Sequence, residues 1–234
     1  MSESATRSPR SGTEPPARVV RHRGADRLYH WCMAACVLTL LGTAFLPIVG
    51  LKFAWLEAHW ISGVILAALV MFHIVRATIW QDFWAMMVMP ADLRDACTQL
   101  RHAFGRSPAP PPLPGKYPLL QKLYHLAVAV IVLGLIVTGL MMTVKIDTPF
   151  WTRNPYWLSE SAWGVIYVIH DLAAMTTLTL VMIHVYFAIR PEKLWITRSM
   201  ILGWITRREY LDHHDPARWT AEPADRGAGG KGRL

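Results

Sequence analysis

The chain has 234 residues, of which 53% are hydrophobic and 17% charged, and its mean hydropathy is positive. This composition excludes an ordinary water-soluble globule, and the length is that of one domain. The formal net charge is +8. It does not indicate a nucleic-acid partner, because the basic residues cluster in alternate connections between the apolar stretches, as membrane topology requires.

Residues 1–25 are rich in Ser, Pro, Arg and Gly and have no hydrophobic periodicity, which predicts a disordered arm. Four apolar stretches follow, and each is long enough to cross a bilayer as a helix. The polar segment ahead of the first stretch, and the lack of a small-residue cleavage pattern after it, predict a retained helix and not a signal peptide. The predicted spans are 28–49, 55–80, 118–144 and 162–189.

The longest connection, residues 81–117, is a predicted cytoplasmic linker. Its first part, 81–105, mixes apolar with charged residues and is typical of an amphipathic segment at a membrane interface. The stretch 107–118 is rich in proline and predicts a stiff connector. Beyond the last span, residues 191–234 form a predicted basic tail on the cytoplasmic side.

Basic residues are divided unequally among the polar segments. Of the 24 Lys and Arg residues, all but Lys52, Lys145 and Arg153 lie before position 28, between positions 76 and 122, or after position 189. With an even number of spans, the positive-inside rule then places both termini in the cytoplasm. We therefore expect an all-α integral membrane protein, a four-helix up-down bundle surrounded by lipid.

The three cysteines form neither a C-x-x-C nor a C-x-x-C-H motif. Covalently attached haem and a zinc ribbon are therefore disfavoured. The sequence also offers no cysteine set for an iron–sulfur cluster and no nucleotide-binding loop.

The second half of the chain repeats the first. Two short motifs recur, Arg27-Leu28-Tyr29-His30 as Lys122-Leu123-Tyr124-His125, and Val70-Met71-Phe72-His73 as Val181-Met182-Ile183-His184. Two related hairpins predict a bundle with an approximate internal twofold axis.

Two of the predicted helices each carry two histidines fourteen residues apart, His59 with His73 and His170 with His184. Fourteen helical steps turn the chain ~1400°, close to four full turns, and advance it ~21 Å. Both imidazoles of each helix therefore leave the same face at two depths. Helices with histidines at matched heights are able to hold two stacked metal centres across a bilayer.

Haem is the candidate group for these centres. Two neutral imidazoles bind haem iron and leave no open position for oxygen, which serves electron transfer. Copper or zinc does not explain two layers ~21 Å apart with apolar walls between them. The alternative is that the histidines only form hydrogen bonds between helices, and the repeated spacing argues against it. We therefore predict two haems.

The outer layer contains only His59 and His170, which are the predicted ligands of the outer haem. The inner layer contains four histidines for two places: His30, His73, His125 and His184. Symmetry between the second and fourth spans pairs His73 with His184. Bare geometry also permits His30 with His184.

Several motifs occur in this order between about residue 25 and residue 219: Asp26-Arg27-x-x-His30-Trp31, His59-x-x-x-Gly63 followed by Arg76, Gly115-Lys116-Tyr117 with Gln121-Lys122, Val137-Thr138-Gly139, Ile169-His170 with Ile183-His184-Val185-Tyr186, and His213-His214 ahead of Pro216 and Trp219. In this order and register the chain resembles the cytochrome b (gamma) subunits of respiratory formate dehydrogenases. Their wider group includes the cytochrome b subunits of nickel–iron hydrogenases.

This resemblance implies a four-helix bundle with two b haems. It implies His59 and His170 as axial ligands of the outer haem iron, and His30 and His184 as those of the inner haem iron. His73 and His125 are additional to the family pattern, and His73 remains the alternative to His30.

The resemblance also implies a quinone site at the segment leading into the third span, where Lys116 and Gln121 match the family pattern. Pro118 and Leu120 depart from that pattern, since they replace its Asn and Gly. His125 is a further candidate residue. One role for it is to handle quinone protons at this site, and the other is to bind a propionate of the inner haem.

The function that the resemblance implies is electron transfer in a bacterial inner membrane. Electrons would pass from an iron–sulfur subunit and a catalytic dehydrogenase subunit, through two haems, to quinone. The chain is then a redox subunit of an oxidoreductase and not a complete enzyme. The alternatives are a stand-alone quinol-oxidising cytochrome b that donates to a soluble acceptor, and a non-redox membrane anchor.

Overall fold

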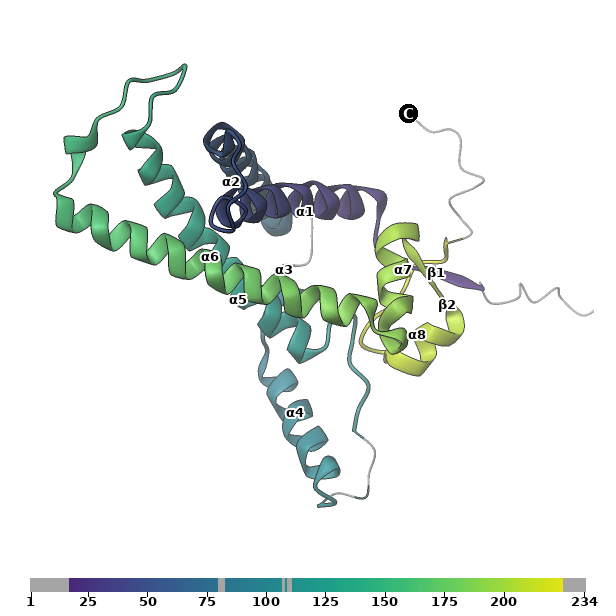
Figure 1. The fold of residues 1–234 in the computed structure, drawn as a ribbon. Coiled ribbons are helices and arrows are strands. Elements are labelled where there is room, and N and C mark those ends of the chain that lie inside the picture. The colour runs from purple at the N-terminus through teal and green to yellow at the C-terminus, as the bar shows by residue number, and fades with distance from the viewer. Residues whose placement is uncertain (1–16, 80–82, 107, 109–110, 225–234) are drawn as a thin grey trace, which may run out of the picture.

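A computed structural model describes residues 17–79, 83–106, 108 and 111–224. In this part of the chain four helices are long and apolar enough to cross a membrane (Figure 1): α1 (Gly24–Phe45), α2 (Trp55–Ile79), α5 (Leu119–Met142) and α6 (Glu160–Ile189). The prediction of an all-α membrane protein with four spans is confirmed.

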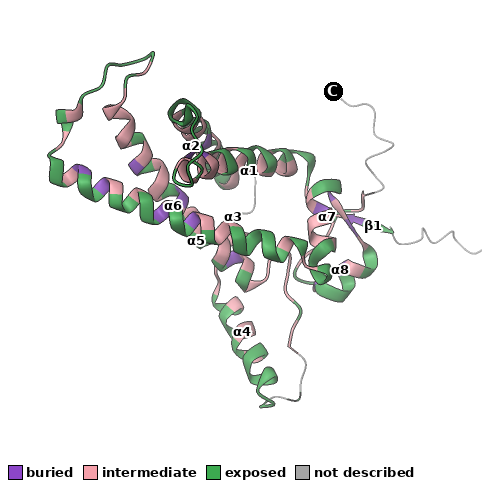
Figure 2. Ribbon diagram, in the orientation of Figure 1, coloured by how far each residue is buried: buried purple, intermediate pink, exposed green. Residues whose placement is uncertain are grey.

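The surfaces of these helices are apolar where they are exposed. Figure 2 shows mostly exposed and half-buried residues along all four, and the exposed side chains include Leu38, Met71, Val130 and Met175. An apolar surface of this extent on an ordinary soluble monomer would drive association. On this protein it is the face that contacts lipid.

The helix ends follow local sequence. The backbone N–H of Arg23 donates to the Asp26 carboxylate (3.2 Å) ahead of α1, and the Ser159 hydroxyl accepts from the Ala162 N–H (3.3 Å) at the start of α6. The first helix ends at Phe45, short of the predicted boundary at 49. Pro47 follows in a turn because it has no N–H to continue the helix.

The four helices form two hairpins, with α1 packed along α2 and α5 packed along α6; α2 also packs against α5. The same hydrogen bond recurs in both hairpins. The Tyr29 hydroxyl donates to the Leu69 carbonyl (3.0 Å), and the Tyr124 hydroxyl donates to the Leu180 carbonyl (2.8 Å). The internal repeat in the sequence is therefore also a repeat of tertiary contacts.

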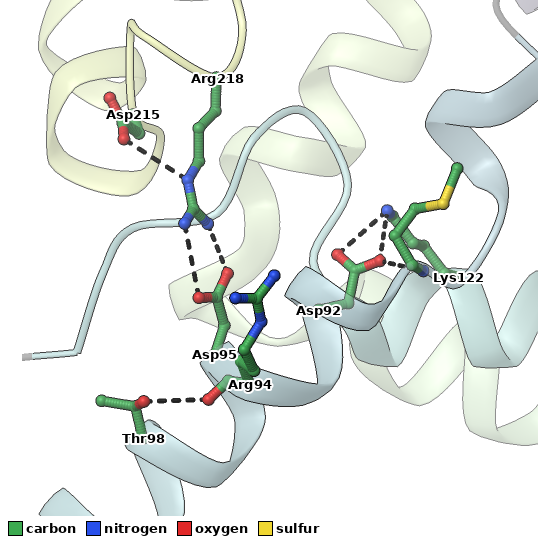
Figure 3. A network of polar contacts seen from close by, with 8 residues as sticks. Asp92, Arg94, Asp95, Thr98, Lys122, Asp215 and Arg218 are labelled. Carbon is green, nitrogen blue, oxygen red and sulfur yellow. Dashed lines mark hydrogen bonds and ion pairs between the residues drawn. The ribbon is translucent and has the colours of Figure 1, made fainter.

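The linker between the hairpins contains α3 (Phe83–Met86) and α4 (Pro90–Ala103), and α4 projects away from the bundle (Figure 1). Charged contacts hold its base in place (Figure 3). The buried Lys122 ammonium on α5 lies 2.8 Å from Asp92, while Arg218 in the C-terminal segment pairs with Asp95. These contacts join the linker to the second hairpin and to the C-terminal segment.

The two ends of the described chain form a small domain, the cap (residues 17–23 and 191–224). In it, β1 (Arg18–Val20) pairs antiparallel with β2 (Trp204–Thr206), beside three helical segments: η3 (Pro191–Lys193), α7 (Leu194–Leu202) and α8 (Arg207–His213). Its core is formed by Val19, Ile205 and Tyr210.

Composition predicts a disordered arm over residues 1–25, and the structure differs at β1. Val19 is 3% exposed and packs with Ile205, and the Val20 N–H donates to the Glu222 carbonyl (2.8 Å). This burial and pairing outweigh the local composition. Residues 1–16 of the predicted arm lie outside the described residues.

A buried polar pair joins the cap to the linker. His214 is 3% exposed; its Nδ1–H donates to the Gly115 carbonyl (2.7 Å), and its Nε2 accepts from the Arg21 guanidinium (2.8 Å). Burial lowers the pKa of His214 to about 4. The folded cap therefore contains the neutral imidazole.

This arrangement predicts that the cap loses stability in acid. Because the folded pKa of His214 lies below the ordinary value of 6.5, the unfolded cap binds the proton more readily. The stabilisation is fully present above pH 6.5 and declines as the pH falls toward about 4. Amide hydrogen exchange over residues 204–214, corrected for intrinsic rates, measures the effect.

His214→Gln is the matched control, since its amide replaces both hydrogen bonds and does not titrate. We expect a smaller loss of protection in acid for this variant. Some loss will remain, because burial also lowers the pKa of His22 in the same cap, to about 3. Equal pH dependence in the variant and the parent would contradict the assignment to His214.

Candidate functional site

The outer pair of histidines lies between the two hairpins. His59 on α2 and His170 on α6 have ring centres 6.4 Å apart and planes inclined by 65°. Both are half-buried. The structure thus brings together the two residues predicted for the outer layer.

Each of these rings contacts a buried threonine on the neighbouring helix of its own hairpin. His59 Nδ1 lies 2.8 Å from the Thr43 hydroxyl, and His170 Nδ1 lies 2.9 Å from the Thr138 hydroxyl. Each hydroxyl already donates within its own helix, to the carbonyl of Thr39 (2.8 Å) or of Gly134 (2.7 Å). The hydroxyls must therefore accept from Nδ1–H, which leaves Nε2 unprotonated as a metal ligand requires.

Gly139 makes room for one of these rings. A Cβ atom at this position would lie 3.3 Å from His170 Cε1, tighter than ordinary van der Waals contact. The close approach of α5 and α6 at this height therefore depends on a residue without a side chain.

The inner layer contains two further pairs. His30 on α1 faces His184 on α6, with ring centres 6.2 Å apart and planes inclined by 50°. His73 on α2 faces His125 on α5, with ring centres also 6.2 Å apart and planes inclined by 65°. Periodicity leaves His30 and His73 as alternative partners of His184. In the structure, His30 is the one that lies opposite His184.

Tyrosines from the repeated motif stack on one ring of each inner pair. Tyr29 lies parallel to His73, with ring centres 5.1 Å apart, and Tyr124 lies parallel to His184, with ring centres 5.9 Å apart. Together with the hydrogen bonds to the Leu69 and Leu180 carbonyls, this stacking holds the rings at defined angles.

The ring separations fit one metal ion between each pair. With a metal–imidazole bond of about 2.0 Å and a ring centre about 1.1 Å behind the nitrogen, two trans imidazoles place their ring centres about 6.2 Å apart. A direct N–H···N hydrogen bond of about 2.9 Å would bring them to about 5.1 Å or closer. All three observed separations, 6.2 to 6.4 Å, are longer than a direct hydrogen bond allows and leave room for a metal ion between the rings.

The donor set fits haem. In the described residues no group of three or more His, Cys, Asp or Glu side chains is placed to hold a metal ion. Pairs of imidazoles among apolar helices suit an iron whose other four ligands come from a porphyrin.

The residues predicted for quinone lie at the N-terminal end of α5. The Lys116 ammonium lies 5.2 Å from the ring centre of Tyr117 and 5.9 Å from that of Trp219. The Gln121 N–H donates to the Pro118 carbonyl in the first turn of α5 (3.0 Å). His125 is one turn further on, with its ring toward His73.

Two contacts of this site were not predicted, those of Thr43 and Thr138 with the outer histidines. The repeat contained a signal for them. Each threonine follows the histidine of the Leu-Tyr-His motif, His30 or His125, by thirteen residues.

Four apolar helices whose histidines meet in facing pairs define a membrane cytochrome of the b type. The comparisons with known proteins agree, and the chain belongs to the family described as prokaryotic cytochrome b561, whose model matches residues 21–203. This family implies haem b as the cofactor. The chain is also similar to a Haemophilus influenzae protein described as formate dehydrogenase, cytochrome b556 subunit. The two are 24% identical over 232 residues, which cover 88% of this chain and 83% of that protein.

The threonine contacts predict that haem retention depends on residues that do not touch iron. Thr138→Val removes the acceptor that orients His170, and loss of such a contact typically lowers affinity about 10- to 100-fold. We expect correspondingly faster haem transfer to apomyoglobin, followed by absorbance.

Thr39→Val is the matched control, because the Thr39 hydroxyl donates to the Ala35 carbonyl of its own helix (2.9 Å). We expect haem retention close to that of the parent in this variant. Equal haem loss from both variants would show that the effect of Thr138 is not specific to its contact with His170.

Proposed function

We propose that this chain is the di-haem cytochrome b subunit of a respiratory dehydrogenase. In this proposal His59 and His170 bind the outer haem, and His30 and His184 bind the inner one. The observation that supports it most directly is the separation of these ring pairs, 6.4 and 6.2 Å, at two heights along one helix, α6.

Haem bound in these pairs supplies one-electron transfer without an open position for oxygen. The chain's own part is to orient the ligands and exclude water. Thr43 and Thr138 leave the Nε2 atoms of the outer histidines free to bind iron, and Tyr124 stacks on His184. In this proposal α6 contributes a ligand to both haems, at heights ~21 Å apart.

We propose that His30, and not His73, is the second ligand of the inner haem. His184 faces His30, while His73 faces His125. This choice also agrees with the pattern of the formate dehydrogenase subunits that the sequence resembles.

The proposed orientation has both termini in the cytoplasm of a bacterial inner membrane. The membrane domain is residues 26–190, preceded by the arm (1–25) and followed by the tail (191–234). The basic residues support this orientation, since all but Lys52, Lys145 and Arg153 lie before position 28, between positions 76 and 122, or after position 189. The cap, built from parts of the arm and the tail, then lies on the cytoplasmic side.

The proposed partners are an iron–sulfur subunit and a catalytic dehydrogenase subunit on the outer side. The name of the Haemophilus relative, a formate dehydrogenase subunit, supports a complex of this kind. Quinone is the proposed acceptor on the cytoplasmic side, near Lys116 and Gln121, because these residues lie where α5 enters the bundle next to the inner histidines.

The proposed ligand pairs predict a specific pattern of haem loss. His30→Ala and His184→Ala should each abolish the same redox component, so that the double variant loses no more haem than either single one. His170→Ala should abolish a different component. Haem content and spectroelectrochemical titration of the purified protein measure both effects.

His102→Ala on α4, outside the bundle, is the control for these variants and should keep the parental haem content. If His30→Ala and His184→Ala have additive effects, the two residues do not share one haem. If the parent purifies without haem despite an adequate haem supply, the chain acts as a passive anchor.

A second experiment tests the proposed partners. The full chain, tagged in its native host and solubilised in mild detergent, should purify with a protein that contains iron–sulfur clusters. If the cytochrome instead purifies alone, oxidises quinol and passes the electrons to a soluble acceptor, it is a stand-alone quinol-oxidising cytochrome b.

A further inference from the structure

The proposed function leaves one pair of membrane histidines without a role. His73 and His125 face each other in the inner layer with ring centres 6.2 Å apart, the same separation as His30 and His184. No hydrogen bond joins their rings in the part of the chain that the structure describes. Their separation exceeds the value of about 5.1 Å that such a bond allows.

The internal repeat accounts for this pair. It relates the Leu-Tyr-His motif of α1 to that of α5, and the Leu-Val-Met-x-His motif of α2 to that of α6. His30 therefore corresponds to His125, and His184 corresponds to His73. The repeat converts the pair His30–His184 into the pair His125–His73.

The contacts around the two inner pairs are also repeated. Tyr29 stacks on His73 with an interplanar angle of 16°, and Tyr124 stacks on His184 with an angle of 20°. Each tyrosine hydroxyl donates to the carbonyl four residues before the histidine on which its ring stacks. The tyrosine contacts of one proposed haem ligand are thus reproduced around His73.

His73 also has an unused polar atom. Its Nδ1 is buried and makes no hydrogen bond with any described residue. A buried polar atom without a partner destabilises a fold, so such groups are usually explained by a bound ion, water or cofactor. Iron bound at Nδ1 itself would give this atom a partner.

We propose that His73 and His125 are the axial ligands of a third b haem, beside the inner haem and at the same depth. This proposal rests on the proposed function, since it uses the same ligand chemistry. The site adjoins the proposed quinone segment, because His125 lies one helical turn after Gln121.

The two inner sites are not equivalent in charge. Arg76 lies three residues after His73 and forms an ion pair with Asp26, whereas the repeat places Phe187 and Gln121 at the corresponding positions in the other half. Fixed charges near a haem change its reduction potential. The third haem should therefore titrate at a potential of its own.

The first test is the number of haems per chain. Haem is measured as the pyridine haemochromogen and protein by quantitative amino-acid analysis, with native mass spectrometry of the intact protein as an independent count. We expect three haems in the parent chain and three in His102→Ala. We expect two in His73→Ala, in His125→Ala and in their double variant.

The haem count separates the two proposals. Two haems in the parent chain, unchanged in His73→Ala and His125→Ala, would overturn the third site and leave the di-haem function standing. Fewer than two in the parent would overturn the proposed function itself.

A conservative variant covers the case in which removal of an imidazole prevents folding. His73→Met replaces bis-histidine ligation by Met/His ligation, which raises the potential of a haem. We expect three haems, with one redox component shifted to higher potential and two unchanged. Unshifted components would show that His73 packs the bundle without binding iron.

Discussion

The cost of placing imidazoles in hydrocarbon governs this structure. A polar ring inside a bilayer destabilises the fold unless its nitrogen atoms find partners, because no water is available there. Six histidines occupy four apolar helices, and all six occur in facing pairs. Each pair joins helices of different hairpins: α1 with α6, α2 with α6, and α2 with α5.

In each hairpin, one helix supplies a hydrogen-bond partner for Nδ1 of the outer histidine on the other helix. Thr43 and Thr138 each accept from a ring on the neighbouring helix while donating to their own backbone. A threonine placed in this way fixes both the rotation of the ring and the nitrogen that holds the proton. The hairpin is therefore the unit that orients a ligand, and the space between the hairpins is where two ligands meet.

Much of this arrangement is predictable from sequence, because it depends on local periodicity. The four spans, the two histidine layers and the repeat all follow from spacing along single helices. The strand pair of the cap does not follow, since Val19 and Ile205 are brought together by packing between segments far apart in the chain. Likewise, periodicity gives the height and face of His184 but not the helix that lies opposite it.

The inner layer shows why symmetry alone gives the wrong neighbour. His73 and His184 correspond in the repeat, but a twofold axis exchanges corresponding residues, and these meet only if they lie on the axis. His59 and His170 correspond and face each other, so the axis passes between them at the outer level. Residues away from the axis face neighbours that do not correspond to them. The axis relates the off-axis pair His30–His184 to a second off-axis pair, formed by the corresponding residues His125 and His73. Because His73 and His125 form this pair, the symmetry that makes four inner histidines ambiguous in the sequence also gives each of them a partner in the structure.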